Sequence, residues 1–192
     1  DIATESRAAV AGGITSFMDM PNTAPPTISR QRLQEKYELA GGRSFANYSF
    51  YLGAANDNLE EIRALDPREA CGIKIFLGSS TGNLCVDDPG AVEAVFAHAP
   101  TLLAAHCEDD AIIAANSARV RSRYGDAVPM TEHPAIRSTD ACLQSSARAV
   151  ALARRHDTRL HILHLSTAAE LDLLSDRPLE EKRITAEVCV HH

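Results

Sequence analysis

The sequence contains no tryptophan, and aromatic residues make up only 5% of its 192 residues. It has no apolar run of about 18 residues, which a membrane-spanning helix would need. It also has no run rich in lysine or arginine of the kind that binds nucleic acid or an anionic membrane. The net charge is −7, so we expect neither a membrane nor a nucleic-acid partner.

Two further patterns are missing. The five cysteines are scattered, odd in number and without a Cys-x-x-Cys pair, which favours a reducing compartment, and therefore a cytoplasmic protein, over a disulfide framework. No Gly-x-Gly-x-x-Gly fingerprint follows the first predicted strand. Its absence disfavours a dinucleotide-binding fold.

The sequence does contain a regular alternation of strand and helix patterns. Apolar residues make up 45% of the chain and charged residues 23%, as in an ordinary folded domain. Strands are predicted at residues 14–20, 45–52, 71–77, 101–106, 159–166 and 183–190. Helices are predicted at residues 1–11, 29–40, 58–65, 91–98, 111–123, within 134–156, and at 168–174.

The predicted strands are apolar on both faces, which indicates a parallel sheet covered by helices, either doubly wound or closed into a (β/α)8 TIM barrel. A full barrel takes about 250 residues. The chain opens on Asp1 and stops within a predicted strand. We therefore expect an α/β partial barrel covering roughly strands 2 to 7, with residues 1–192 as the central part of a single barrel domain.

A lysine lies inside the apolar run of residues 72–82, which glycines bound on both sides. Strand alternation places Ile73, Ile75 and Leu77 on one face, with Lys74 and Phe76 on the other. On an edge strand the ammonium of Lys74 would reach solvent. In a closed interior, burial would lower its pKa. The neutral amine could then add carbon dioxide to give a carbamate that bridges two divalent ions.

Other polar residues fall at the carboxyl ends of the predicted strands, where barrel enzymes carry their chemistry. They are Asp19, Asn22, His106, His164 and Glu187. Imidazole is a common metal ligand, so two such histidines near an inward lysine can build a metal site. Taken singly, each histidine also fits a hydrogen-bonded core position.

The choice between His161 and His164 rests on strand alternation. Residues three apart on a strand face opposite ways, so at most one is a ligand, and His164 lies nearer the carboxyl end. His161 is expected to pack against a helix or cap a turn. In the last predicted strand, Glu187 shares one face with Cys189 and His191, and Glu187 is expected to contact the metal centre from outside its ligands.

Six motifs, in order along nearly the whole chain, resemble those of the dihydroorotases in the amidohydrolase superfamily. They are DMPNTAPPT (19–27), GIKIF (72–76), AHCED (105–109), HPAIRS (133–138), HILHLST (161–167) and TAEV (185–188). The form of the first motif resembles dihydroorotase more than allantoinase or dihydropyrimidinase. The resemblance implies an amidohydrolase-type barrel that reversibly hydrolyses dihydroorotate to N-carbamoyl-L-aspartate in pyrimidine biosynthesis.

The resemblance also implies roles for single residues. Lys74 would carry the bridging carbamate between two divalent ions, expected to be Zn²⁺, with His106 and His164 as ligands of one of them. Asn22 would contact the substrate carboxylate. The family's His-x-His ligands and arginine on strand 1, and its proton-transferring aspartate on strand 8, have no match here, so no catalytic acid or base is expected in this segment.

Two alternatives stay open. One is a related cyclic amidohydrolase, an allantoinase, hydantoinase or dihydropyrimidinase. The other is a non-catalytic dihydroorotase-like scaffold for aspartate carbamoyltransferase, which should have lost metal ligands that this chain retains. A homo-oligomer is expected, and aspartate carbamoyltransferase is a candidate partner.

Overall fold

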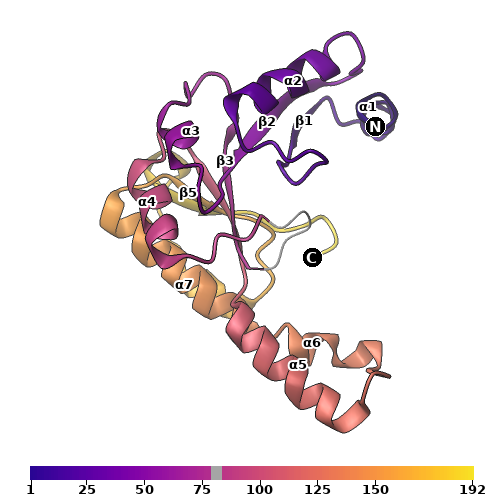
Figure 1. Cartoon of the computed structure of the whole chain (residues 1–192), viewed down its shortest axis with the longest axis vertical. Coiled ribbons are helices and arrows are strands. Elements are labelled where there is room, and N and C mark those ends of the chain that lie inside the picture. Colours follow the sequence, from indigo (N-terminus) through magenta and orange to yellow (C-terminus); the bar gives the residue numbers. More distant parts are fainter. Residues whose placement is uncertain (79–83) are drawn as a thin grey trace.

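The computed structural model describes residues 1–78 and 84–192, so the part of the lysine run at 79–82, with its second glycine turn, lies outside the described residues. Within the described chain, six parallel strands lie side by side in sequence order (Figure 1). They are β1 (Ser16–Asp19), β2 (Asn47–Gly53), β3 (Gly72–Leu77), β4 (Leu103–Cys107), β5 (Leu160–Ile162) and β6 (Ile184–Ala186). A doubly wound sheet reverses its strand order at a switch point. The sequential order therefore confirms the barrel-type α/β fold, here an open half-barrel.

Helices connect the strands, and several begin at a side chain that caps the first turn. The Asp109 carboxylate accepts from the N–H of Ile112 at the start of α5, and Ser29 caps α2 in the same way. The α-helices are α1 (Ile2–Ala11), α2 (Arg30–Ala40), α3 (Leu59–Arg63), α4 (Pro89–His98), α5 (Asp110–Tyr124), α6 (His133–Ile136) and α7 (Thr139–His156). Short 3-10 turns lie at η1 (Met130–Glu132), η2 (Ala168–Leu173) and η3 (Leu179–Glu181).

The helix predicted at 168–174 is instead the 3-10 segment η2. The hydroxyl of Thr167 and the carboxylate of Glu170 form a capping box at its start, and the chain is extended again at Leu174. Its backbone therefore follows the tighter 3-10 geometry, with i→i+3 hydrogen bonds, which is common in short connecting segments.

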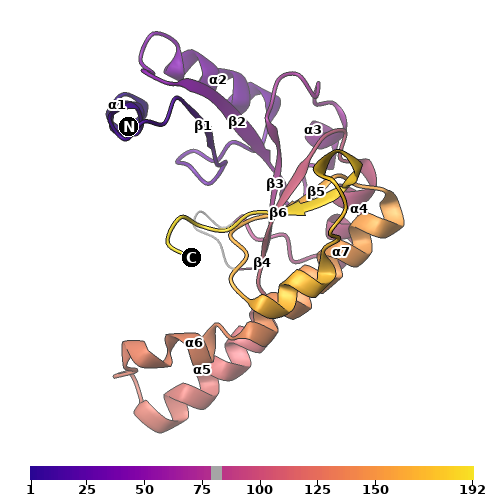
Figure 2. The same cartoon turned by 180° about the vertical axis from the view of Figure 1, so that it is seen from behind.

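The two faces of the sheet are covered differently. Helices α2, α3, α4 and α7 lie against its convex face (Figures 1 and 2), where the main core gathers around residues such as Phe50, Ile73 and Leu103. The concave face has a smaller apolar cluster of Tyr51, Ala104 and Leu163. Side chains that alternate away from the main core therefore point into the concave face.

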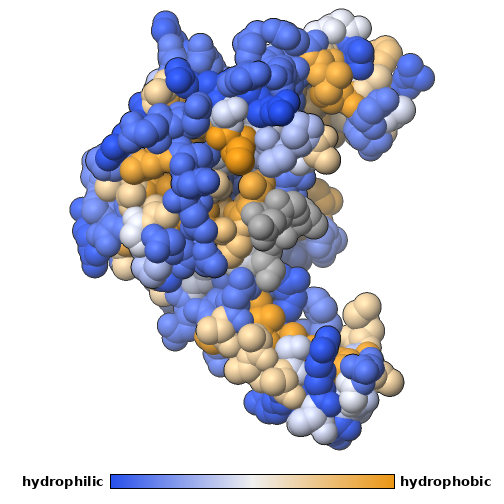
Figure 3. Space-filling view, viewed as in Figure 1, coloured by the Kyte–Doolittle hydropathy of each residue, from blue (hydrophilic) through white to orange (hydrophobic). Residues whose placement is uncertain are grey.

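Helices α5 and α6 contact each other and project from the body of the molecule as an arm (Figures 1 and 2). Its visible surface mixes hydrophilic and hydrophobic residues (Figure 3). Among the residues that the structure describes, no helix is both long and apolar enough to cross a membrane.

Candidate functional site

Lys74 lies in the middle of the sheet, because β3 pairs with β2 on one side and β4 on the other. Only 2% of the residue is exposed. Its Nζ donates to the carbonyl of Ile75 at 2.8 Å and lies 3.6 Å from the centroid of the Phe76 ring. Burial lowers the pKa of Lys74 to about 7. The interpretation of Lys74 as a residue of an edge strand is therefore wrong. Near neutral pH, a substantial fraction of this lysine carries a neutral amine.

Two histidine nitrogens converge on the same side of the sheet. His106 is in register with Phe76, two residues beyond Lys74 on β3, so its ring is on the concave face with the lysine. Its Nδ1 lies 3.1 Å from Nε2 of His164. Burial lowers the pKa of His164, and the nearby His106 lowers it further, which favours the neutral imidazole that binds metals.

His161 does not pack against a helix or cap a turn, contrary to the prediction. It is in register with Ala104 and therefore faces the concave side. Its Nδ1 lies 2.8 Å from the hydroxyl of Thr185, and its Nε2 lies 3.4 Å from a carboxylate oxygen of Glu187. The alternation argument failed because β5 ends at Ile162, and His164 adopts a positive φ of 39° beyond it. Both histidines can thus lie on the concave side.

Glu108 and Arg137 join the site although the sequence reasoning did not select them. The buried Glu108 places Oε2 2.9 Å from Nε2 of His106. Arg137 donates from Nε to Oε1 at 2.7 Å and from Nη2 to Oε2. Burial raises the pKa of Glu108, but the hydrogen bonds from His106 and Arg137 outweigh it and lower the pKa to about 2. Both residues lie in quoted motifs, AHCED and HPAIRS, which was the available signal.

Part of this group lines a cavity of about 370 Å³, although Lys74 and His161 are not among its lining residues. Its walls include His106, Glu108, Arg137 and His164. A larger cavity of about 740 Å³ lies between α1, β1 and α2, but its lining is mainly apolar and includes none of the predicted ligands. The smaller cavity is therefore the one that contains two of the predicted ligands, His106 and His164.

The remaining predicted residues are placed less centrally. Asn22 is half-buried in the loop after β1 and lines neither of these cavities. The side chain of Glu187 is 53% exposed, beside His161. Glu187 lies beyond β6 and close enough for its charge to act on His164. The structure thus brings Glu187 near the histidines, while Asn22 stays in its loop.

Asp19 is the strand-end residue that the structure moves away from the site. It is in register with Phe50, whose ring lies in the helix-covered core. Its Oδ2 accepts from Nζ of Lys36 on α2 at 2.8 Å. The parity of β1 thus directs this carboxylate to the convex face, where it pairs with a buried lysine.

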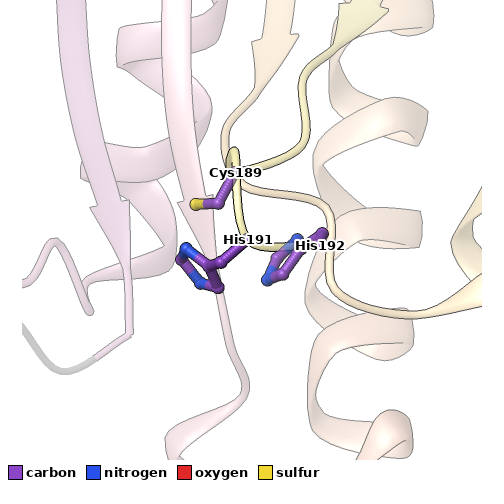
Figure 4. Close-up of side chains that lie close together, drawn as sticks. All are labelled: Cys189, His191 and His192. Carbon is purple, nitrogen blue, oxygen red and sulfur yellow. The ribbon is translucent and has the colours of Figure 1, made fainter. Parts of the chain in front are cut away.

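A second group of metal-ligating side chains lies in the turn after β6. The strand predicted to run to Val190 ends at Ala186, and the N–H of His192 donates to the carbonyl of Cys189 at 3.0 Å. Cys189, His191 and His192 each offer a ligand atom, all within 4.8 Å of one another (Figure 4). Both histidines are exposed, so this turn could take up a metal ion at the surface.

Comparisons with known proteins identify relatives of the chain in sequence and in fold. No family model matches the chain. An allantoinase of Streptomyces avermitilis is 34% identical over 98% of the chain and 42% of its own length. A dihydroorotase of Pyrococcus furiosus is 33% identical over the whole chain and 39% of its own length.

The fold matches a solved structure equally well. An L-hydantoinase (dihydropyrimidinase) from Arthrobacter aurescens superposes with a TM-score of 0.89 and 26% identity, covering 98% of this chain and 42% of that one. The chain thus spans about two-fifths of the length of these relatives. Sequence and fold together make it a homologue of the cyclic amidohydrolases, with dihydroorotase, allantoinase and hydantoinase relatives at similarly low identity.

Proposed function

We propose that this chain is the central part of a metal-dependent cyclic-amide hydrolase that interconverts dihydroorotate and N-carbamoyl-L-aspartate. One observation carries the proposal. The buried Lys74 shares the concave face with His106, whose Nδ1 converges with Nε2 of His164. A buried lysine beside two converging imidazoles has little use in a purely structural sheet, because its desolvation is costly.

The residues present fit a pair of divalent cations. His106 and His164 offer two nitrogens 3.1 Å apart, and imidazole suits Zn²⁺. The neutral Nζ of Lys74 could add to the carbon of carbon dioxide and release a proton to solvent, and the resulting carbamate would offer oxygen ligands to the cations. When bound, the cations would polarise the ring carbonyl of the substrate and activate water.

Other residues of the chain would serve the substrate and the ligands. Asn22 would donate its amide N–H to the substrate carboxylate without adding charge. Glu187 would contact His161 and would influence the histidines through its negative charge, without binding a metal ion itself. The remaining metal ligands and the proton-transferring aspartate implied by the dihydroorotase resemblance belong to strands 1 and 8, so turnover is expected of the longer protein.

The test is an assay of the longer protein with dihydroorotate, allantoin and hydantoin in parallel. We expect ring opening of dihydroorotate to dominate, and Asn22→Ala to raise its KM while leaving turnover of the uncharged hydantoin unchanged. Lys74→Ala should abolish the two-metal stoichiometry by elemental analysis, whereas the partly exposed Lys182→Ala should keep it. Two bound metals in Lys74→Ala would contradict the carbamate.

A second candidate, hydrolysis of allantoin or a hydantoin, is favoured by the allantoinase relative at 34% identity and by the hydantoinase fold match. Preferred turnover of either compound in the same assay would select it. The scaffold alternative is less well supported, because Lys74, His106 and His164 are all retained. A homo-oligomer, and aspartate carbamoyltransferase as a partner, remain proposals for the longer protein.

A further inference from the structure

Glu108 is the middle member of a series of three contacting side chains, Arg137, Glu108 and His106, which runs from the arm to the candidate metal centre. One of its oxygens lies 2.9 Å from Nε2 of His106, and Arg137 donates two hydrogen bonds to the same carboxylate. Arg137 immediately follows α6, at the base of the arm. The chain Arg137–Glu108–His106 therefore ends on the nitrogen pair that faces the site.

The contact with Glu108 determines which nitrogen of His106 carries the hydrogen. An ionised carboxylate can only accept, so Nε2 must be the donor in this contact. Neutral imidazole carries one N–H, and Nδ1 is therefore left with its lone pair. That lone pair is directed towards His164. If the Glu108 carboxylate were removed, its preference for the Nε2–H tautomer of His106 over the Nδ1–H tautomer would be lost.

The position of Glu108 is itself fixed on two sides. Arg137 grips it with a planar fork, a geometry that restricts the carboxylate as well as attracting it. The backbone of Glu108 packs against Gly78, where an added Cβ would lie 2.6 Å from the Glu108 carbonyl oxygen. The carboxylate thus has little freedom to leave His106.

We propose that Glu108 and Arg137 are positioning residues: Glu108 holds the Nε2–H tautomer of His106 so that Nδ1 is free to bind a metal ion, and Arg137 holds Glu108 in place. The inference rests on the proposed function in taking His106 as a ligand. It adds that metal affinity depends on two residues that do not touch the metal. Outer partners of this kind typically contribute about 10–100-fold to metal affinity.

The first measurement is the zinc affinity of the longer protein by competition with a chromophoric chelator. All variants carry Cys189→Ser and His191→Ala, which removes the surface cluster of the turn after β6. We expect Glu108→Ala to weaken zinc binding about 10–100-fold. Glu108→Gln should recover part of the affinity, because its amide oxygen still accepts from Nε2. Arg137→Met should give an intermediate loss.

Glu93 provides a matched control. It also bridges an arginine and a histidine, accepting from Arg155 at 3.0 Å and lying 3.2 Å from Nε2 of His156, but on the surface away from the site. Glu93→Ala should leave zinc affinity unchanged. An equal loss in Glu93→Ala and Glu108→Ala would mean that a general loss of stability, and not positioning, is being measured.

The second measurement separates this inference from the proposed function. Nitrogen-15 NMR of the metal-free protein reports the tautomer of His106 directly. We expect Nε2–H in the parent protein and a shift towards Nδ1–H in Glu108→Ala, with folding confirmed by circular dichroism. An unchanged tautomer and unchanged zinc affinity in Glu108→Ala would overturn the inference. A changed tautomer with weaker zinc binding, in a protein that does not open dihydroorotate, would uphold it and reject only the proposed substrate.

Discussion

Nδ1 of His106 and Nε2 of His164 lie 3.1 Å apart although 58 residues separate them in the sequence. The two histidines differ in their backbone position: His106 is inside β4, whereas His164 is beyond the end of β5. Parallel pairing of β4 with β5 brings the two rings together. The pair thus links the ends of the two strands at the candidate site.

Removing His164 should therefore reduce zinc affinity by more than the roughly 10–100-fold that loss of an outer partner costs. The physical reason is that one of two direct nitrogen donors is lost. Competition with a chromophoric chelator measures the change in His164→Ala. The variant His156→Ala, which loses the contact with Glu93 away from the site, should bind zinc as the parent does. Equal affinity in both variants would remove His164 from the site.

The burial of Lys74 predicts a pH dependence of stability. Its pKa is about 7 in the folded protein and near 10.5 in the unfolded chain. Between these values the unfolded state binds more protons, so stability rises with pH, by up to about 1.4 kcal/mol per pH unit. Below the folded pKa both states are protonated, and the cost of holding the buried ammonium no longer changes.

The comparison is between the parent protein and Lys74→Met, both without metal and in buffers free of carbon dioxide. Urea unfolding at several pH values gives the free energy of unfolding of each. Subtracting the two removes the titration of all other groups. The difference should slope upward with pH above about 7. A flat difference would show that Lys74 is solvated.

A substitution at Gly78 tests the coupling between this position and Glu108, because a side chain there would meet the backbone of Glu108. An added Cβ would lie 2.6 Å from its carbonyl oxygen and 3.2 Å from its carbonyl carbon. Gly78→Ala should cost about 1–3 kcal/mol of stability and should weaken zinc binding, since Glu108 must move. Gly12→Ala is the control, with an ordinary φ of −83° and a nearest contact of 3.4 Å. Unchanged zinc affinity in a folded Gly78→Ala would contradict the coupling.

The pair of Asp19 and Lys36 predicts an effect on stability alone. Lys36 is 8% exposed and is held by Asp19 and by the carbonyl of Met20, each at 2.8 Å. Asp19→Ala leaves the ammonium with one partner fewer and should cost about 1–3 kcal/mol. The double variant with Lys36→Met should recover part of this loss, because no buried charge remains.

Urea unfolding of both single variants and the double variant gives the coupling energy of this pair. Zinc affinity should stay at the parent value in all three. Loss of zinc binding in Asp19→Ala would instead show that Asp19 belongs to the site, as its position at the end of a strand first indicated.

The sequence alone determined the alternation of strands and helices, the parallel sheet and the unusual position of Lys74. These features follow from periodicity and from the cost of burying a charge, which act locally and can be read along the chain. It also selected His106 and His164, because carboxyl ends of strands are marked by an abrupt change from apolar to polar residues. The length of the last strand and the helical form of 168–174 were predicted wrongly, since element ends depend on neighbours.

Only the tertiary structure decided how the side chains are used. Register placed Asp19 on the convex face and His161 on the concave face, and no local pattern contains that information. The contacts from Arg137 through Glu108 to His106 join segments 29 residues apart, and the nitrogen of His106 that we propose as a metal ligand follows from them. Hydrogen bonds between distant segments form only when the strands are paired, so the sequence named the candidate metal-binding residues and the fold assigned their orientation.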